Sequence, residues 1–159
     1  MSSTGSTPTA QSKNSAMSGT DTTGLAVVDA GVIVGHLDRS DRHHHAATRA
    51  LSQLAATAER LMLPVTAFAE CLVYPMAAGG GADKELEAAL ATIPIGVLNA
   101  DSDTARRAAR IRAEYSSLKL PDAFVIATAI VNDATALLTT DREWPKALIA
   151  QLPFEILTV

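Results

Sequence analysis

The sequence predicts an α/β fold with a mostly parallel sheet and helices on both of its faces. Short apolar runs alternate with helical segments along the chain, which is the pattern of strand–helix–strand units. Aromatic residues make up only 4% of a sequence that is 48% hydrophobic, so the core must be built from Ala, Leu, Val and Ile. Such a core suits helices packed closely on a sheet. A chain of 159 residues is one domain's worth.

The chain divides into a polar N-terminal segment and one folded domain. Residues 1–24 are rich in Ser, Thr and Gly and carry almost no apolar side chains. Such a segment buries too little surface to offset its ordering entropy, so a disordered tail is predicted. An addition to the natural chain and an over-extended start are both compatible with this segment, since Met17 is a plausible second initiator. Residues 25–159 are predicted to form the domain.

Five short apolar runs are predicted to be strands. The first is apolar without interruption up to its closing acid, as is typical of a parallel strand buried on both faces. The runs are LAVVD (25–29), RLMLPV (60–65), PIGVL (94–98), TALLTT (135–140) and FEILTV (154–159).

Helices are predicted between these strands. Thr66 is a plausible N-cap for the third helix, and Pro75 followed by three glycines indicates where that helix ends. The first helix begins at Gly31 and is separated by the polar break DRSDRHHH (38–45) from a second that runs to about residue 58. The others are expected over residues 66–77, 83–93, 101–118, 121–131 and 142–150.

Four acids are expected at one edge of the sheet. Parallel strands place their carboxyl ends at a shared edge, where sites form in α/β proteins. Asp29 ends the first strand and Asp141 follows the fourth. The remaining two lie early in helices that start at that edge: Glu70 in the third helix, and Asp122 in the helix before the fourth strand.

Each acid has an ordinary structural explanation when it is taken alone. Asp122 follows Pro121 and suits the first turn of a helix, and Asp141 suits a loop. Glu70 is harder to explain in this way because its neighbours are almost all apolar. Four carboxylates close together repel one another unless a cation is present, and Mg²⁺ or Mn²⁺ prefers such oxygen ligands. A divalent metal site is therefore expected.

Other features limit the classes of function. The formal net charge is −4, but a basic strip that includes Arg106 and Arg110 is a candidate for contact with a polyanion. The lone Cys71 excludes a disulfide framework and a cysteine zinc site. No run is long enough for a membrane span and no signal peptide is evident, so no membrane association and a cytoplasmic location are expected.

Four motifs together resemble a known family. VVDAGVIVGHLDRSDRHHHAA, VTAFAECLV, LPDAFVIATAI and LLTTDREW, in this order and spacing, are similar to the PIN domain. More narrowly, they resemble the VapC toxins of type II toxin–antitoxin systems. The resemblance covers roughly residues 25 to 158, and the segment LPDAxxxATA…LLTxD is its most specific part.

The resemblance implies a PIN-like three-layer α/β/α sandwich that acts as a Mg²⁺- or Mn²⁺-dependent endoribonuclease. Asp29, Glu70, Asp122 and Asp141 would form the catalytic metal site, with Asp29 and Asp122 as main ligands. Thr139 would orient the site, and Glu70 or Asp141 would orient or deprotonate a metal-activated water. The implied partners are an RNA substrate, a VapB-type antitoxin and a second copy of the chain in a homodimer.

One position departs from the family pattern. Ser, Asn or Thr often stands two residues after the first acid, where this chain has Gly31, so a hydroxyl or amide that supports the metal is missing. The histidines at 43–45 are not expected to bind a metal, because adjacent helical residues point in different directions. Cys71 is expected to be a small buried hydrophobe and Trp144 a core anchor.

Two other functions remain as alternatives. A Mg²⁺-dependent phosphatase would use an Asp at the end of the first strand, but no Lys is suitably placed in a strand-end loop. A catalytically silent domain of the same fold would act as a partner-binding module. The Gly31 departure keeps that alternative open, whereas the presence of all four acids disfavours it.

Overall fold

The computed structural model describes residues 24–57 and 59–159. These residues form one five-stranded sheet in the order β3-β2-β1-β4-β5, and each neighbouring pair is parallel. The prediction of an α/β fold with a mostly parallel sheet is confirmed. The strands are β1 (Leu25–Val28), β2 (Arg60–Pro64), β3 (Ile95–Leu98), β4 (Ala136–Thr139) and β5 (Glu155–Thr158).

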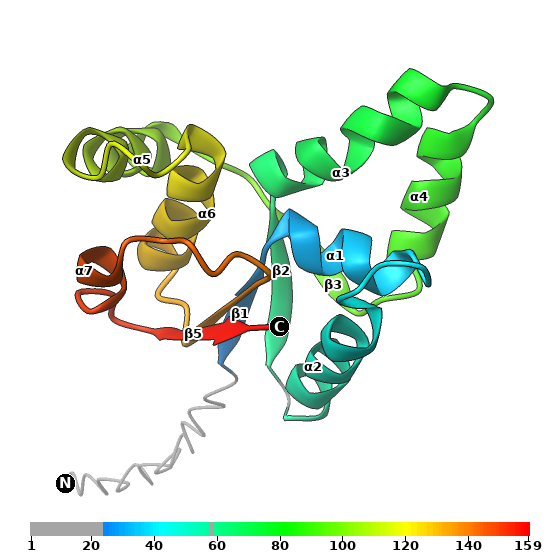
Figure 1. Ribbon diagram of the computed structural model, residues 1–159, viewed down its shortest axis with the longest axis horizontal. Coiled ribbons are helices and arrows are strands. Elements are labelled where there is room, and N and C mark those ends of the chain that lie inside the picture. The colour runs from blue at the N-terminus through cyan, green and yellow to red at the C-terminus, as the bar shows by residue number, and fades with distance from the viewer. Residues whose placement is uncertain (1–23, 58) are drawn as a thin grey trace, which may run out of the picture.

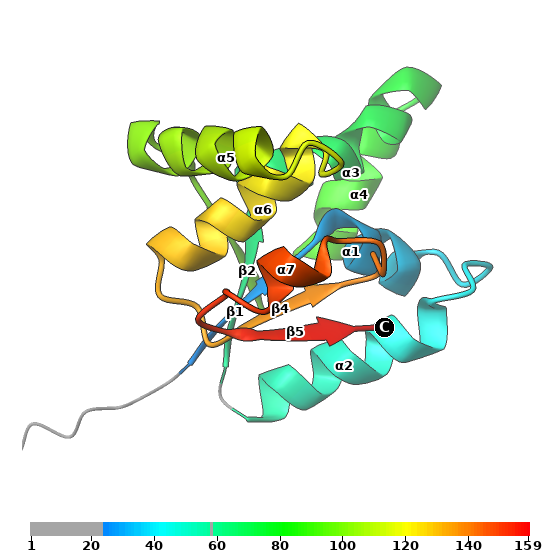
Figure 2. The same ribbon diagram turned by 60° about the vertical axis from the view of Figure 1, so that its left-hand side comes forward.

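Helices cover the sheet on both faces, which gives three layers (Figures 1 and 2). Helix α6 packs over one face, with α5 outside it, and α2 lies beneath the other face. The paired ends of α3 and α4 project from the body of the molecule. The helices are α1 (Ala30–Leu37), α2 (His44–Ala56), α3 (Val65–Ala78), α4 (Ala82–Leu90), α5 (Ser102–Glu114), α6 (Leu120–Val131) and α7 (Lys146–Ile149).

The core lies around the two strands in the middle of the sheet. All residues of β1 and β4 are buried, as expected for strands that have neighbours on both sides and helices on both faces. The helix packed against them is correspondingly apolar, with six buried side chains in α6. Burial of these aliphatic groups supplies the main stabilising free energy, at about 25 cal/mol per Å² of apolar surface.

The register of β1 and β4 sets the position of the site. Val28 pairs with Leu138. The ladder continues one step further, because the N–H of Asp29 donates to the carbonyl oxygen of Leu138 at 2.9 Å. Asp29 therefore leaves the sheet beside Thr139, the last residue of β4.

Several helix boundaries differ from the prediction. Helix α3 has Pro64 and not Thr66 as its N-cap, and it ends at Ala78, one residue beyond the predicted end, with Pro75 in its last turn, where a proline removes only one backbone hydrogen bond. Helix α4 ends at Leu90, three residues before the predicted end. Helix α5 ends at Glu114, and residues 115–119 form the turn into α6. The predicted helix over 142–150 is only the single turn Lys146–Ile149, since Pro145 restricts the residue before it to extended conformations.

The predicted tail over residues 1–24 lies outside the described residues except for Gly24. Within the described part of the chain, no helix combines the length and the apolar character needed to span a membrane.

Candidate metal centre

Asp29 is held rigidly where β1 meets α1. Its side chain is only 8% exposed. Oδ1 accepts a hydrogen bond from the N–H of Ala30 at 2.8 Å, so Asp29 is the N-cap of α1. Oδ2 accepts from the hydroxyl of Thr139 at 2.7 Å. A carboxylate with both oxygens held by donors has a fixed orientation, and its remaining lone pairs are available to a cation.

Thr139 connects Asp29 to the second acid of the site. Its hydroxyl is fully buried; it donates to Asp29 and accepts from the backbone N–H of Asp141 at 3.0 Å. The Oδ1 atom of Asp141 then accepts from the N–H of Glu143 at 2.7 Å, which turns the chain after β4. One threonine thus fixes the positions of two acids from different strands.

Asp122 and Glu70 reach the same edge from two helices. Asp122 lies in the first turn of α6, which begins at this edge, and it is half-buried. Pro121 suits that first turn because the N–H that it lacks has no partner there in any helix. Glu70 lies in the second turn of α3 and is more exposed.

Electrostatic coupling among the acids shows that they share one region. Burial raises the pKa of Asp29, and the charge of Asp141 raises it further. Burial also raises the pKa of Asp122, with smaller contributions from Asp29 and Asp141. The pKa of Glu70 is raised by desolvation and then by Asp29 and Asp122. The positive charge of Lys119 partly offsets the shifts at Asp122 and Glu70.

The acids converge without closing around a single point. Among the described residues, no three His, Cys, Asp or Glu side chains are close enough together to hold one ion as they stand. Mutual repulsion among the carboxylates favours such spacing, and the positive charge of Lys119 offsets it only in part. The donor set is all oxygen and anionic, which fits a hard divalent cation that also keeps several waters.

The comparison with protein families identifies the fold. The sequence matches the PIN domain over residues 26–148, most of the chain. The chain belongs to the PIN domain family. PIN domains are generally nucleases, and they typically use divalent metals. The VapC-like resemblance of the sequence motifs agrees with this membership.

Solved structures of toxin–antitoxin proteins share the fold of this PIN domain. A toxin–antitoxin complex from Klebsiella pneumoniae matches with a TM-score of 0.61 and 25% identity, covering 82% of this chain and 94% of that one. The sarcin-ricin loop cleaving toxin VapC20 of Mycobacterium tuberculosis matches with a TM-score of 0.62 and 16% identity, covering 77% of this chain and 94% of that one. VapBC-5 from the same organism matches with a TM-score of 0.58 and 23% identity, covering 86% of this chain and 99% of that one. No curated protein matches by sequence.

The space beside Gly31 in this PIN domain is filled by the residue that follows β4. A Cβ atom built on Gly31 would lie 2.3 Å from Oγ1 of Thr140. The hydroxyl of Thr140, from the end of β4, therefore occupies the position that a side chain at residue 31 would enter. The sequence showed the missing side chain but gave no sign of this neighbour.

The histidines serve separate contacts. Nδ1 of His36 lies 2.9 Å from the hydroxyl of Thr48, Nδ1 of His44 lies 3.1 Å from the carbonyl oxygen of Gly35, and Nδ1 of His43 lies 3.0 Å from that of Val159. Within the described part of the chain, no group of three possible metal ligands includes them.

Cys71 and Trp144 are core residues, as predicted. Each is only 4% exposed. Burial raises the pKa of the Cys71 thiol to about 12, so the reactive thiolate is not formed near neutral pH.

The predicted substrate-positioning arginines lie away from the acids. Arg106 and Arg110 line a shallow groove with Val131, at the end of α6 opposite to Asp122. The rise of a helix separates those two ends of α6 by roughly 13 Å. Arg106 is also paired with Asp103. Contact of these arginines with a substrate stays a prediction.

Proposed function

We propose that this PIN domain is a Mg²⁺- or Mn²⁺-dependent endoribonuclease and the toxin of a type II toxin–antitoxin system. The observation that carries the proposal is the arrangement of acids around the buried Thr139 hydroxyl. Two of them are hydrogen bonded to Thr139, and a third, Asp122, is electrostatically coupled to both. The raised pKa values of Asp29, Glu70 and Asp122 in one region are typical of a functional site.

Two of the acids are suited to hold the ion, and the other two are suited to act on water. Asp29 and Asp122, which are buried or half-buried, would hold the ion, with Glu70 and Asp141 completing its surroundings. A divalent ion held there supplies the positive charge that activates water and offsets the charge of the phosphoryl oxygens. Glu70 or Asp141 would orient the attacking water or accept its proton. In-line hydrolysis of the RNA would leave a 5′-phosphate and a 3′-hydroxyl.

A protein partner is supported by the surface of α3. Beyond Glu70, the same helix exposes Val73, Tyr74 and Met76 to 67%, 81% and 61%. Neighbouring exposed apolar side chains of this size mark interaction surfaces. A partner helix that covered them would lie next to the acids. We assign this surface to a VapB-type antitoxin or to a second copy of the chain in a homodimer, in the cytoplasm where RNA is cleaved.

The proposal is tested by incubating the purified chain with total bacterial RNA, with and without Mg²⁺ or Mn²⁺. Asp122→Asn is compared with Asp133→Asn, which removes the same charge at the exposed opposite end of α6. Asp133 has a positive φ of 50°, which Asn also accepts. Discrete 5′-phosphorylated products that require metal, persist in Asp133→Asn and vanish in Asp122→Asn are expected. Cleavage that survives Asp122→Asn would contradict the proposal.

The same experiment decides between the nuclease and a catalytically silent partner-binding PIN domain. The observation that favours the silent domain is that no three acids of the described residues close around one ion. A metal-dependent phosphatase is disfavoured by the geometry of Asp29. Its two oxygens are both hydrogen bonded and the side chain is buried, which does not suit a nucleophile that must reach phosphorus.

A further inference from the structure

A solvent-open cavity of about 670 Å³ adjoins the acidic site. This is within the size range of ligand pockets, roughly 300 to 1,000 Å³. It has one wall in common with the site, because Asp141 lines it. Its lining is formed by Arg42, His43, Ala46, Thr140, Asp141, Arg142, Glu143 and Val159.

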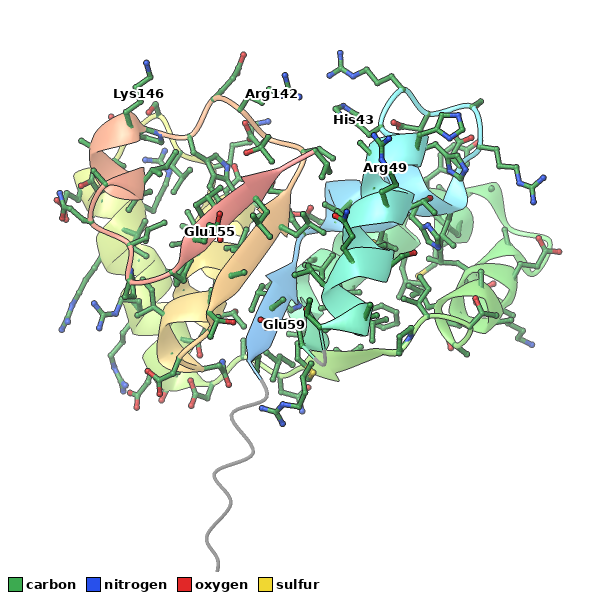
Figure 3. The ribbon with its side chains drawn as sticks, turned by 90° about the horizontal axis from the view of Figure 1, so that it is seen from below. His43, Arg49, Glu59, Arg142, Lys146 and Glu155 are labelled. Atoms are coloured by element: carbon green, nitrogen blue, oxygen red, sulfur yellow. The ribbon has the colours of Figure 1, made fainter. Side chains whose placement is uncertain are left out.

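Two segments that are distant in sequence bring positive charge to this cavity. Arg42 and His43 come from the loop before α2, and Arg142 comes from the loop after β4. Figure 3 shows His43 and Arg142 at neighbouring positions, with Lys146 further away on α7 and Arg49 further along α2. The order of the sheet produces this meeting, since β5 carries Val159 to the side of His43.

A short chain of hydrogen bonds fixes Arg42 in this cavity. Its Nε–H donates to Nε2 of His43 at 2.8 Å. Nε2 must then be an acceptor, so Nδ1 carries the ring proton and donates to the carbonyl oxygen of Val159 at 3.0 Å. Both terminal amino groups of Arg42 are left free by these contacts.

Neither arginine forms an ion pair with an acid within the described part of the chain. The ion pair found there joins Arg106 to Asp103 and involves neither Arg42 nor Arg142. Two acids do line the cavity, but Oδ1 of Asp141 is occupied by the N–H of Glu143, and Glu143 pairs with neither arginine. Two unpaired guanidinium groups beside an open cavity match an anion that accepts several hydrogen bonds, such as a phosphate.

We propose that Arg42, His43 and Arg142 form a subsite that binds a backbone phosphate of single-stranded RNA next to the phosphate being cleaved. The assignment rests on the proposed nuclease function. The strand would cross from the acids into the cavity at Asp141, which belongs to both. His43 is a positioning residue, because it acts by holding Arg42. Arg106 and Arg110 lie at the other end of α6 from Asp122, so they are less suited to a phosphate adjoining the cleaved bond.

The test is metal-free binding of a labelled single-stranded RNA, followed by fluorescence anisotropy at several salt concentrations in EDTA. The full chain is compared with Arg42→Gln, Arg142→Gln and the matched control Arg49→Gln. Arg49 is exposed on α2, near the cavity but outside its lining. Each lost phosphate contact should lower the slope of log K against log salt by about 0.7. It should also weaken binding about tenfold at low salt.

The subsite is supported if Arg42→Gln and Arg142→Gln both lower the salt slope of log K and the affinity for RNA, while Arg49→Gln binds RNA as the natural chain does. Unchanged binding in the two variants would overturn the subsite, and so would an equal loss in Arg49→Gln, because that would indicate a diffuse field. Binding of an acidic peptide but not of RNA, lost in both variants, would replace RNA with a protein partner.

Cleavage with Mg²⁺ separates this subsite from the proposed function. The two variants should raise KM with kcat nearly unchanged, since they weaken binding without touching the reacting groups. RNA that binds through both arginines without being cleaved would leave the subsite standing while the nuclease proposal fails. If both variants cleave RNA with the KM of the natural chain, the nuclease proposal stands while the subsite fails.

Discussion

The hydroxyl of Thr139 donates a hydrogen bond to Oδ2 of Asp29 across 2.7 Å, although the two residues are 110 positions apart in the chain. The hydroxyl oxygen of Thr139 also accepts a hydrogen bond from the backbone N–H of Asp141. The pairing of β1 with β4 makes this contact possible, because it places the ends of both strands at one level. The buried threonine therefore determines how two acids of the site stand relative to each other.

Replacing this hydroxyl should weaken the metal site without unfolding the protein. Thr139→Val keeps the shape of the side chain but removes the donor to Asp29 and the acceptor for Asp141. Loss of a residue that orients metal ligands typically costs about 10–100-fold in metal affinity or activity. Mn²⁺ titration calorimetry would measure this loss.

A second buried threonine provides the control for that experiment. Thr128 is 2% exposed, and its hydroxyl donates to the carbonyl oxygen of Phe124 within α6. Thr128→Val makes the same chemical change away from the acids, so its Mn²⁺ affinity should equal that of the natural chain. Equal losses in both variants would mean that Thr139 acts only through general stability.

The sequence predicted the convergence of the acids because that depends only on strand direction. Once the strands are parallel, Asp29 and Asp141 must leave the sheet at the same edge, and the helices that carry Glu70 and Asp122 must start there. The function of the four as metal ligands stays a prediction. The contact of Thr140 with Gly31 was not predictable, because it depends on the rotamer of one side chain and on β1–β4 pairing.

The cavity lined by Arg42 and Arg142 was missed for a related reason. Arg42 lies in the predicted polar break over 38–45, and Arg142 was expected to begin a short helix over 142–150, so nothing in the sequence connected the two. They face one cavity only because the sheet order places β4 and β5 beside α2, and the apolar pattern does not specify that order.

Gly31 and Thr140 should be energetically coupled. Gly31→Ala would place a methyl group 2.3 Å from the present position of Oγ1 of Thr140, so the threonine side chain must move. Overpacking of this kind costs roughly 1–3 kcal/mol. In a Thr140→Ala background the space is empty, and Ala should then stabilise α1 by about 0.5 kcal/mol over Gly.

A double-mutant cycle by urea denaturation measures this coupling. The four proteins are the natural chain, each single variant and the double variant. We expect a coupling free energy of about 1.5 to 3.5 kcal/mol, the difference between the cost of Gly31→Ala in the natural chain and its gain in the Thr140→Ala background. Additive effects of the two substitutions would show that Thr140 rotates away without cost.

The acids should make the stability of the metal-free protein depend on pH. The pKa values of Asp29, Glu70 and Asp122 are raised, chiefly by burial and then by the charges of neighbouring acids of the site. Between the ordinary carboxyl pKa, about 4, and these raised values, the folded state binds more protons than the unfolded state. The free energy of unfolding should therefore rise as the pH falls through that window and be lower at neutral pH.

Thermal unfolding in EDTA across that window provides the measurement. Asp122→Asn should flatten the dependence and raise the melting temperature at neutral pH, while Asp133→Asn should do neither. Metal affinity should have the opposite trend and fall as the pH is lowered, because protons compete for the same oxygens. A melting temperature that rose with pH in EDTA would contradict these signs.

The exposed apolar surface of α3 should govern self-association if a second copy covers it. Tyr74 is 81% exposed. Tyr74→Ser would remove the largest apolar side chain of this α3 surface without disturbing the core. Analytical ultracentrifugation should show a dimer for the natural chain and a shift toward monomer for the variant. A dimer of unchanged strength would exclude this surface from the homodimer and leave it to the antitoxin.

Direct titration of Mn²⁺ into the metal-free protein tests the central claim, that the acids at this edge hold a divalent cation. The natural chain and Asp133→Asn should bind the ion with the same affinity, and Asp122→Asn should bind it at least about tenfold more weakly. The heat of binding should disappear when the pH is lowered far enough to protonate the acids. No binding to the natural chain, or identical isotherms for both substitutions, would contradict the metal centre.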